Sequence, residues 1–152
     1  REIPGLVMRT TFIVGFPGET DAEFQELCEF VEQAKFERVG VFEYSYEPDT
    51  PATRLADHLP DEVKAERRGQ LMEIQQQVAF EWSRQQIGRT LDVLIDSASP
   101  EQDGVWLGRS YTDAPEIDGV TYVVGRKLRP GTFVPVKIVD ARGYDLVGEA
   151  RH

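Results

Sequence analysis

The sequence predicts an α/β unit followed by an all-β unit. Up to about residue 87, the apolar residues follow the periods of a strand, a helix, a second strand and a second helix, in that order. From Arg89 the period changes to two, over five short stretches separated by glycine-containing turns. The charge changes as well, because residues 1–83 hold 8 basic and 17 acidic side chains, whereas residues 84–152 hold 9 and 10. We therefore expect two domains, residues 1–86 and 87–152.

The first strand is expected at residues 10–14. Both of its faces carry β-branched or aromatic residues, which is typical of an interior strand of a parallel sheet, buried on two sides. A glycine-proline turn then ends the strand, made of Gly15, Phe16, Pro17 and Gly18. Turns at the carboxyl ends of parallel strands form the ligand-binding edge, and a ligand there would meet exposed backbone amides and the Phe16 ring. A turn that merely needs small residues is the alternative interpretation.

Residues 20–36 follow as an amphipathic helix. Thr20 is the predicted N-cap, and Glu23 completes a capping box. Cys28 lies in the apolar stripe, which predicts a buried structural thiol. Residues 38–44 are the next strand, and this spacing predicts a parallel pair with a right-handed crossover. Tyr44 and Ser45 would then lie at the same edge as the glycine turn, where they could contact a ligand or simply cap the core.

A long helix of about residues 61–87 is expected to link the two domains, with Asp61 as a candidate cap and Gly88 as its end. Its apolar stripe is predicted to contain Val63, Leu71, Ile74, Val78 and Trp82. Its polar face is predicted to be solvated and to contain Glu66, Arg67, Arg68, Gln75, Gln76 and Gln77. Five strands follow, at residues 90–96, 105–111, 120–124, 133–139 and 144–150. They predict a small closed antiparallel barrel of OB-like type.

The composition of the chain argues against several classes of function. A net charge of −10 argues against general affinity for a phosphate backbone. The single cysteine cannot build a disulfide framework or a cysteine metal site, and it favours a reducing, cytoplasmic setting. No membrane span or secretion signal is apparent. The chain begins at Arg1 without an initiator methionine, so we expect a fragment of a longer protein.

Several motifs resemble those of one enzyme family, in order along nearly the whole chain. Ile-Val-Gly-Phe-Pro-Gly-Glu-Thr at 13–20, Tyr-Ser-Tyr-Glu-Pro-Asp-Thr-Pro-Ala at 44–52 and Leu-Pro-Asp-Glu-Val-Lys at 59–64 resemble the end of the radical S-adenosylmethionine barrel of methylthiotransferases. Residues 88–96 and 130–138 resemble the TRAM barrel that follows it. The resemblance implies that residues 1–86 are the terminal βαβα part of a TIM-like barrel. It also implies an adenosyl-binding role for Gly15, Phe16, Pro17, Gly18, Tyr44 and Ser45.

Two branches of that family are alternative assignments for this chain. Residues 108–119 and 143–149 resemble the RimO type, which adds a methylthio group to an aspartate of ribosomal small-subunit protein number twelve. The other branch modifies an adenosine of transfer RNA, and a non-catalytic RNA- or ribosome-binding TRAM module is a third possibility. Asp113, Glu116 and Asp118 share one loop of a nearly neutral barrel, so they are candidates for docking a basic ribosomal protein. Acidic residues that serve only solubility are the alternative. Arg126, Lys127 and Arg129 could contact ribosomal RNA or form a solvated turn.

The family's cofactors are S-adenosylmethionine and two 4Fe-4S clusters, one of them held by a three-cysteine motif. A chain with one cysteine lacks these ligands, so we expect no metal site and no catalytic residue within it, and no activity from the chain alone. Two parallel strands alone would also leave an edge and an apolar face uncovered, which further strands or a second copy would have to cover.

Overall fold

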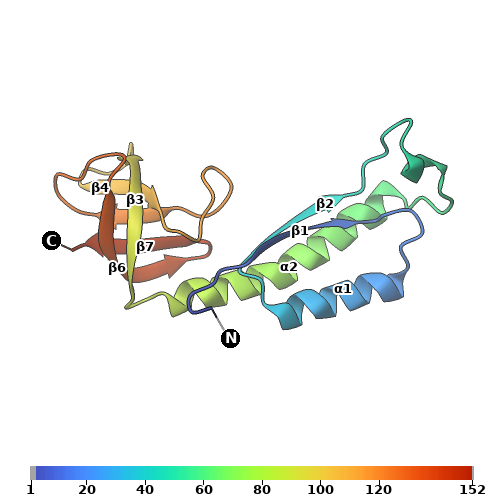
Figure 1. Ribbon diagram of the computed structural model, residues 1–152, viewed down its shortest axis with the longest axis horizontal. Coiled ribbons are helices and arrows are strands. Elements are labelled where there is room, and N and C mark those ends of the chain that lie inside the picture. The colour runs from blue at the N-terminus through green and yellow to red at the C-terminus, as the bar shows by residue number, and fades with distance from the viewer. Residues whose placement is uncertain (1–2, 152) are drawn as a thin grey trace. The chain divides into compact units, whose positions relative to one another are not determined.

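The computed structural model describes residues 3–151 and divides into two compact units, one ending at Val78 and the other starting at Ala79. Figure 1 labels most of their elements. The first unit contains β1 (Arg9–Val14), α1 (Asp21–Ala34), β2 (Arg38–Glu43), a short 3-10 helix η1 (Pro51–Arg54) and most of α2 (Asp61–Gln85). Strands β1 and β2 pair in parallel, in a register that runs from Arg9 opposite Arg38 to Val14 opposite Glu43. The predicted β-α-β arrangement is confirmed.

The core of the first unit lies on one face of the strand pair. Its buried members come from β1, α1, β2 and α2 and are Val14, Phe24, Cys28, Val31, Val41 and Leu71. On the opposite face, Ile13 is 59% exposed and Phe42 is 62% exposed. The expectation that the first strand is buried on both sides is therefore wrong for this chain, because among the described residues only one face of the pair is covered by helices.

Helix α2 begins where the Pro60 carbonyl accepts hydrogen bonds from the amides of Val63 and Lys64. Asp61 does not cap it, because its carboxylate pairs instead with Lys64 Nζ at 2.8 Å. Gly88, at φ +89°, follows the helix in the left-handed conformation that glycine adopts most readily, as predicted.

The buried face of α2 differs from the predicted apolar stripe. It follows steps of three and four residues through Lys64, Arg67, Leu71, Gln75, Ala79, Ser83 and Gln86. The prediction that Arg67 and Gln75 lie on a solvated face is therefore wrong, because both are buried. Gln75 reaches the Glu37 carbonyl through Nε2 at 3.2 Å, and hydrogen bonds of this kind offset the cost of burying a polar group.

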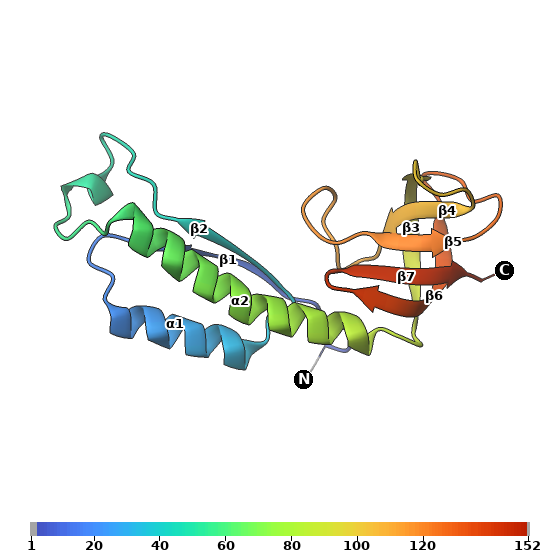
Figure 2. The ribbon, with the colours of Figure 1, turned by 180° about the vertical axis from the view of Figure 1, so that it is seen from behind.

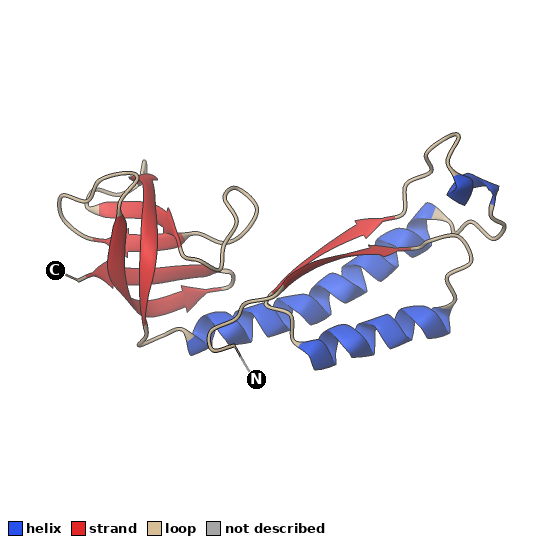
Figure 3. Ribbon diagram, viewed as in Figure 1, coloured by secondary structure: helices blue, strands red, loops and turns tan. Residues whose placement is uncertain are grey.

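The second unit contains a closed five-stranded barrel, whose strands are drawn in red in Figure 3, as are β1 and β2. Its strands are β3 (Thr90–Ala98), β4 (Val105–Arg109), β5 (Thr121–Val124), β6 (Phe133–Arg142) and β7 (Asp145–Ala150). They follow the order β3-β4-β5-β7-β6, and Figure 2 shows the same strands from behind. The buried residues Leu91, Val93, Ile95, Val123, Val136, Ile138 and Leu146 form its core.

The barrel is mixed rather than wholly antiparallel. Four of its strand pairings are antiparallel, but β5 and β7 run in parallel, with Thr121 opposite Leu146. The reason is geometric, because a closed ring with an odd number of strands cannot alternate direction at every step. None of the described helices is both long and apolar enough to cross a membrane.

Candidate functional site

The turn after β1 is built around Gly15. This residue is buried at φ +74°, and a Cβ atom placed on it would lie 2.4 Å from Lys64 Cγ, so both its conformation and its contact with α2 require glycine. The Gly15 amide donates to Glu19 Oε1 at 3.0 Å. The Gly18 amide donates to the Asp57 carbonyl at 3.0 Å. The expectation that a ligand meets exposed amides is therefore wrong for these two, which are already hydrogen-bonded within the chain.

The two predicted corners do lie together. The Tyr44 amide donates to the Val14 carbonyl at 2.9 Å, so the chain leaves β2 beside the end of β1. The Phe16 and Tyr44 rings meet edge to face, with centroids 5.3 Å apart and planes at 75°. Phe16 is exposed, whereas Pro17 is buried and shapes the turn from within. Residues 15–18, Tyr44 and Ser45 thus form a rim at the ends of the two strands, with an aromatic surface made by the exposed Phe16 ring and the half-buried Tyr44 ring.

Polar groups near the rim differ in their availability. The Tyr44 hydroxyl is buried and has no hydrogen-bond partner among the described residues. The Ser45 hydroxyl is engaged, because it donates to Glu47 Oε1 at 3.0 Å. His58, which we did not predict, lies 6.0 Å from the Tyr44 ring, measured between centroids. A buried unsatisfied hydroxyl is uncommon in folded proteins, and a bound ligand is one group that can satisfy it.

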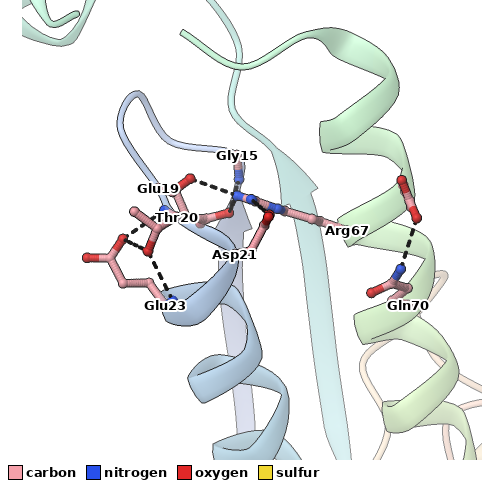
Figure 4. Close-up of polar contacts among 8 residues, drawn as sticks. Gly15, Glu19, Thr20, Asp21, Glu23, Arg67 and Gln70 are labelled. Atoms are coloured by element: carbon pink, nitrogen blue, oxygen red, sulfur yellow. Dashed lines mark hydrogen bonds and ion pairs between the residues drawn. The ribbon is translucent and has the colours of Figure 1, made fainter. Parts of the chain in front are cut away.

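Two cations from α2 support the rim, and sequence reasoning missed both. Lys64 Nζ donates to the Tyr44 carbonyl at 3.3 Å. Arg67 reaches the turn between β1 and α1, as Figure 4 shows, where Nη2 contacts Asp21 Oδ1 at 2.6 Å and Nη1 contacts both the carboxylate and the carbonyl of Glu19. The signal that could have identified them is position, since steps back from Leu71 by four and then three residues reach Arg67 and Lys64.

The negative charges of Asp21 and Glu19 favour the charged form of Arg67. Burial alone would lower the pKa of Arg67, but the hydrogen bonds and negative charges of Asp21 and Glu19 outweigh it and raise that pKa. Glu19 therefore stabilises the turn through its contacts with Arg67 and with the Gly15 amide. The Arg67 guanidinium also lies 5.3 Å from the centroid of the Phe24 ring, which adds a cation–π contact.

The predicted capping box at the start of α1 is present. The Glu23 amide donates to Thr20 Oγ1 at 3.2 Å, and the Thr20 amide donates to Glu23 Oε2 at 2.8 Å. Hydrogen bonds from Thr20, first the backbone amide and then the hydroxyl, hold the pKa of Glu23 below its ordinary value of 4.5. Figure 4 shows this pair beside the contacts of Arg67, so α1 starts from a fixed turn.

The acidic loop after β4 is held by its own carboxylates. Asp113 accepts hydrogen bonds from Ser110 Oγ at 2.9 Å and from Thr112 Oγ1 at 2.8 Å. Asp118 accepts from the Ala114 amide at 2.6 Å. Glu116 is exposed at φ +63°, and it borders a groove of about 470 Å³ that also touches Asp96 and Arg109. Of the three predicted docking residues, Glu116 is the exposed one, and it makes no hydrogen bond with another described residue of the loop.

The described residues contain no group of three histidine, cysteine or acidic side chains that could hold a metal ion. Cys28 is buried within α1, as predicted. Burial raises the pKa of the Cys28 thiol, and the negative charges of Glu19 and Glu29 act in the same direction. A neutral thiol of this kind serves packing rather than metal binding.

Comparison with known proteins first defines the class of the second unit. Residues 87–150 match the TRAM domain family. The chain is therefore a TRAM-domain protein in which a parallel β-α-β unit, with an aromatic rim at the ends of its strands, precedes the barrel.

Relatives with similarity along nearly the whole chain define the family. The chain is 53% identical over 150 residues to the ribosomal protein uS12 methylthiotransferase RimO of Caldanaerobacter subterraneus, a match that covers 98% of the chain and 34% of the relative. For the RimO proteins of Desulfitobacterium hafniense and Anaeromyxobacter sp. (strain K), the identities are 51% and 49%, with 98% and 96% of the chain and 33% and 31% of the relative covered. The chain belongs to the RimO family of methylthiotransferases and spans about a third of the length of these relatives.

Proposed function

We propose that this chain forms part of an enzyme that transfers a methylthio group to an aspartate of ribosomal protein uS12. The observation that carries the proposal is the identity of about half of all residues, along almost the whole chain, to proteins named for that activity. In this proposal the aromatic rim of the first unit forms part of the wall around the adenosyl group, and the TRAM barrel recruits the substrate. The chain alone is inactive.

The residues fit one of the family's two kinds of cofactor. An adenosyl group needs an apolar surface and a few placed polar groups, which Phe16 and the unsatisfied Tyr44 hydroxyl supply. Gly15 and Pro17 shape the turn beneath, while Gly18 and Ser45 complete the rim. S-adenosylmethionine, when bound, supplies the radical chemistry that the family implies. A 4Fe-4S cluster does not fit, because its thiolate ligands cannot come from the one buried cysteine.

The proposal can be tested with the full-length enzyme, loaded with its clusters and supplied with S-adenosylmethionine. We expect isolated uS12 to gain the mass of one methylthio group on an aspartate, and transfer RNA to remain unmodified. Omitting S-adenosylmethionine should abolish the mass gain. Modification of a transfer-RNA adenosine, with uS12 unchanged, would instead assign the chain to the other branch of the family. If neither substrate changed, a non-catalytic RNA- or ribosome-binding role would replace the enzymatic one.

The barrel's partner in this proposal is the basic protein uS12 itself, and the loop of Asp113, Glu116 and Asp118 is the docking site. Glu116 tests it most cleanly, because reversing Asp113 would also break two hydrogen bonds inside the loop. We expect Glu116→Lys to weaken uS12 binding about threefold at low salt, as is typical of one exposed charge pair. Glu101→Lys, the same change in a different exposed loop, is the matched control. Equal affinities for both variants and the wild type would exclude docking through this loop.

The proposal has two further parts, a contact with ribosomal RNA and the location of the enzyme in the cell. Arg126, Lys127 and Arg129 form an exposed basic cluster that could reach ribosomal RNA next to uS12. A cytoplasmic location follows from action on ribosomal protein and agrees with the use of a single, buried and reduced cysteine.

A further inference from the structure

We infer that Arg67 is a positioning residue for the adenosyl-binding rim, acting through Glu19 on the turn that carries Phe16. The inference rests on the proposed function, because it assigns Arg67 a role in the same ligand site. Arg67 does not contact the rim surface itself. It lies on α2, about fifty residues along the chain from the turn that it holds.

The contacts form a continuous path from α2 to the rim. Arg67 donates to both oxygen types of Glu19, the side-chain Oε1 and the backbone carbonyl, the latter at 3.1 Å. Glu19 Oε1 in turn accepts from the Gly15 amide at 3.0 Å. Phe16 follows Gly15 directly, so the path ends at the residue whose ring faces Tyr44. The bonds from Arg67 join α2 to the turn, and the bond from the Gly15 amide joins the two ends of the turn, so the turn has little freedom while Arg67 is present.

Burial makes this path strong. Arg67 is only 5% exposed, and the Glu19 side chain is 14% exposed, so water competes weakly for either group. Asp21 accepts from the other guanidinium nitrogen and fixes the plane of the fork. Lysine could not reproduce this arrangement, because one ammonium group lacks the planar fork that bonds two carboxylates at once. Without Arg67, the partly buried Glu19 carboxylate would have to turn toward water, and it would then release the Gly15 amide.

The test measures affinity of the full-length enzyme for S-adenosylhomocysteine by calorimetry, at a temperature well below the unfolding of every variant. We expect Arg67→Gln to weaken binding about tenfold and Arg67→Lys to give an intermediate value. Arg84→Gln removes the same charge from an exposed position of the same helix and should leave affinity unchanged. Glu19→Gln keeps an acceptor for the Gly15 amide but removes the ion pair, so it should fall between the wild type and Arg67→Gln. It also serves as the test if Arg67→Gln does not fold.

A merely structural arginine would give a different result. It would lower the melting temperature of Arg67→Gln but leave the affinity of the folded variant equal to that of the wild type, which would overturn the inference. Phe16→Ala separates this outcome from failure of the proposed function. If the wild type binds and Phe16→Ala binds more weakly, the rim is the ligand site, and an unchanged Arg67→Gln rejects the positioning role alone. If the wild type itself does not bind, the adenosyl site is rejected.

Discussion

At the scale of single residues, Gly15 is a position where the chain tolerates little change. It combines a left-handed backbone with a contact that leaves no room for a methyl group. We expect Gly15→Ala to lower the free energy of unfolding by about 2–5 kcal/mol, since the left-handed backbone costs about 1–2 kcal/mol and overpacking about 1–3 kcal/mol. Urea unfolding followed by circular dichroism would measure the change.

Two other glycines provide matched controls for this prediction. Gly18, at φ +85°, has no atom within 4 Å of an added Cβ, so Gly18→Ala should cost only about 1–2 kcal/mol of backbone strain. Gly69 lies inside α2 with equally open surroundings, and Gly69→Ala should stabilise the protein by about 0.5–1 kcal/mol. An equal loss at Gly15 and Gly18 would show that the contact with Lys64 adds nothing.

At the scale of elements, local chemistry predicted which helices and strands form and located their ends to within three residues. The capping box placed α1, the glycine after α2 marked its end, and alternation located all five barrel strands. These signals depend on neighbours a few residues apart, which a single sequence displays. The partners of buried polar groups are different, because Arg67 and Glu19 are 48 residues apart in the chain. The helical pattern placed Arg67 on the solvated face, and only the packing of α2 against the turn shows that it contacts two carboxylates.

The same difference between local patterns and distant partners decides which parts of the site could be predicted from the sequence. Parallel pairing of β1 and β2 follows from a short crossover, so the meeting of Phe16 and Tyr44 could be anticipated from the sequence. The occupied amides of Gly15 and Gly18 could not, because their acceptors depend on the folded path of the loop that contains Asp57 and on the rotamer of Glu19. A sequence thus shows which corners meet, but not which of their polar groups remain available to a ligand.

At the scale of the whole molecule, the sequence and the packing place the boundary between the two units at different residues. The sequence places it after residue 86, and the TRAM match begins at residue 87, whereas the contacts place it within α2, after Val78. The last turns of α2 belong to the second unit by their packing. Phe80 and Tyr144 meet edge to face with centroids 5.0 Å apart, and Ala79, Ser83 and Gln86 are buried.

These contacts predict that residues 79–152 form a more stable folded piece than residues 87–152. Both should fold, because the closed barrel leaves no strand edge unpaired. The free energy of unfolding of the longer piece should be higher by about 1–3 kcal/mol, because the Phe80 ring is packed there and contacts Tyr144. Urea unfolding of the two pieces measures the difference, and Phe80→Ala in the longer piece should remove most of it. Equal stability of the two pieces would place the boundary at residue 87, because the end of α2 would then contribute nothing to the barrel.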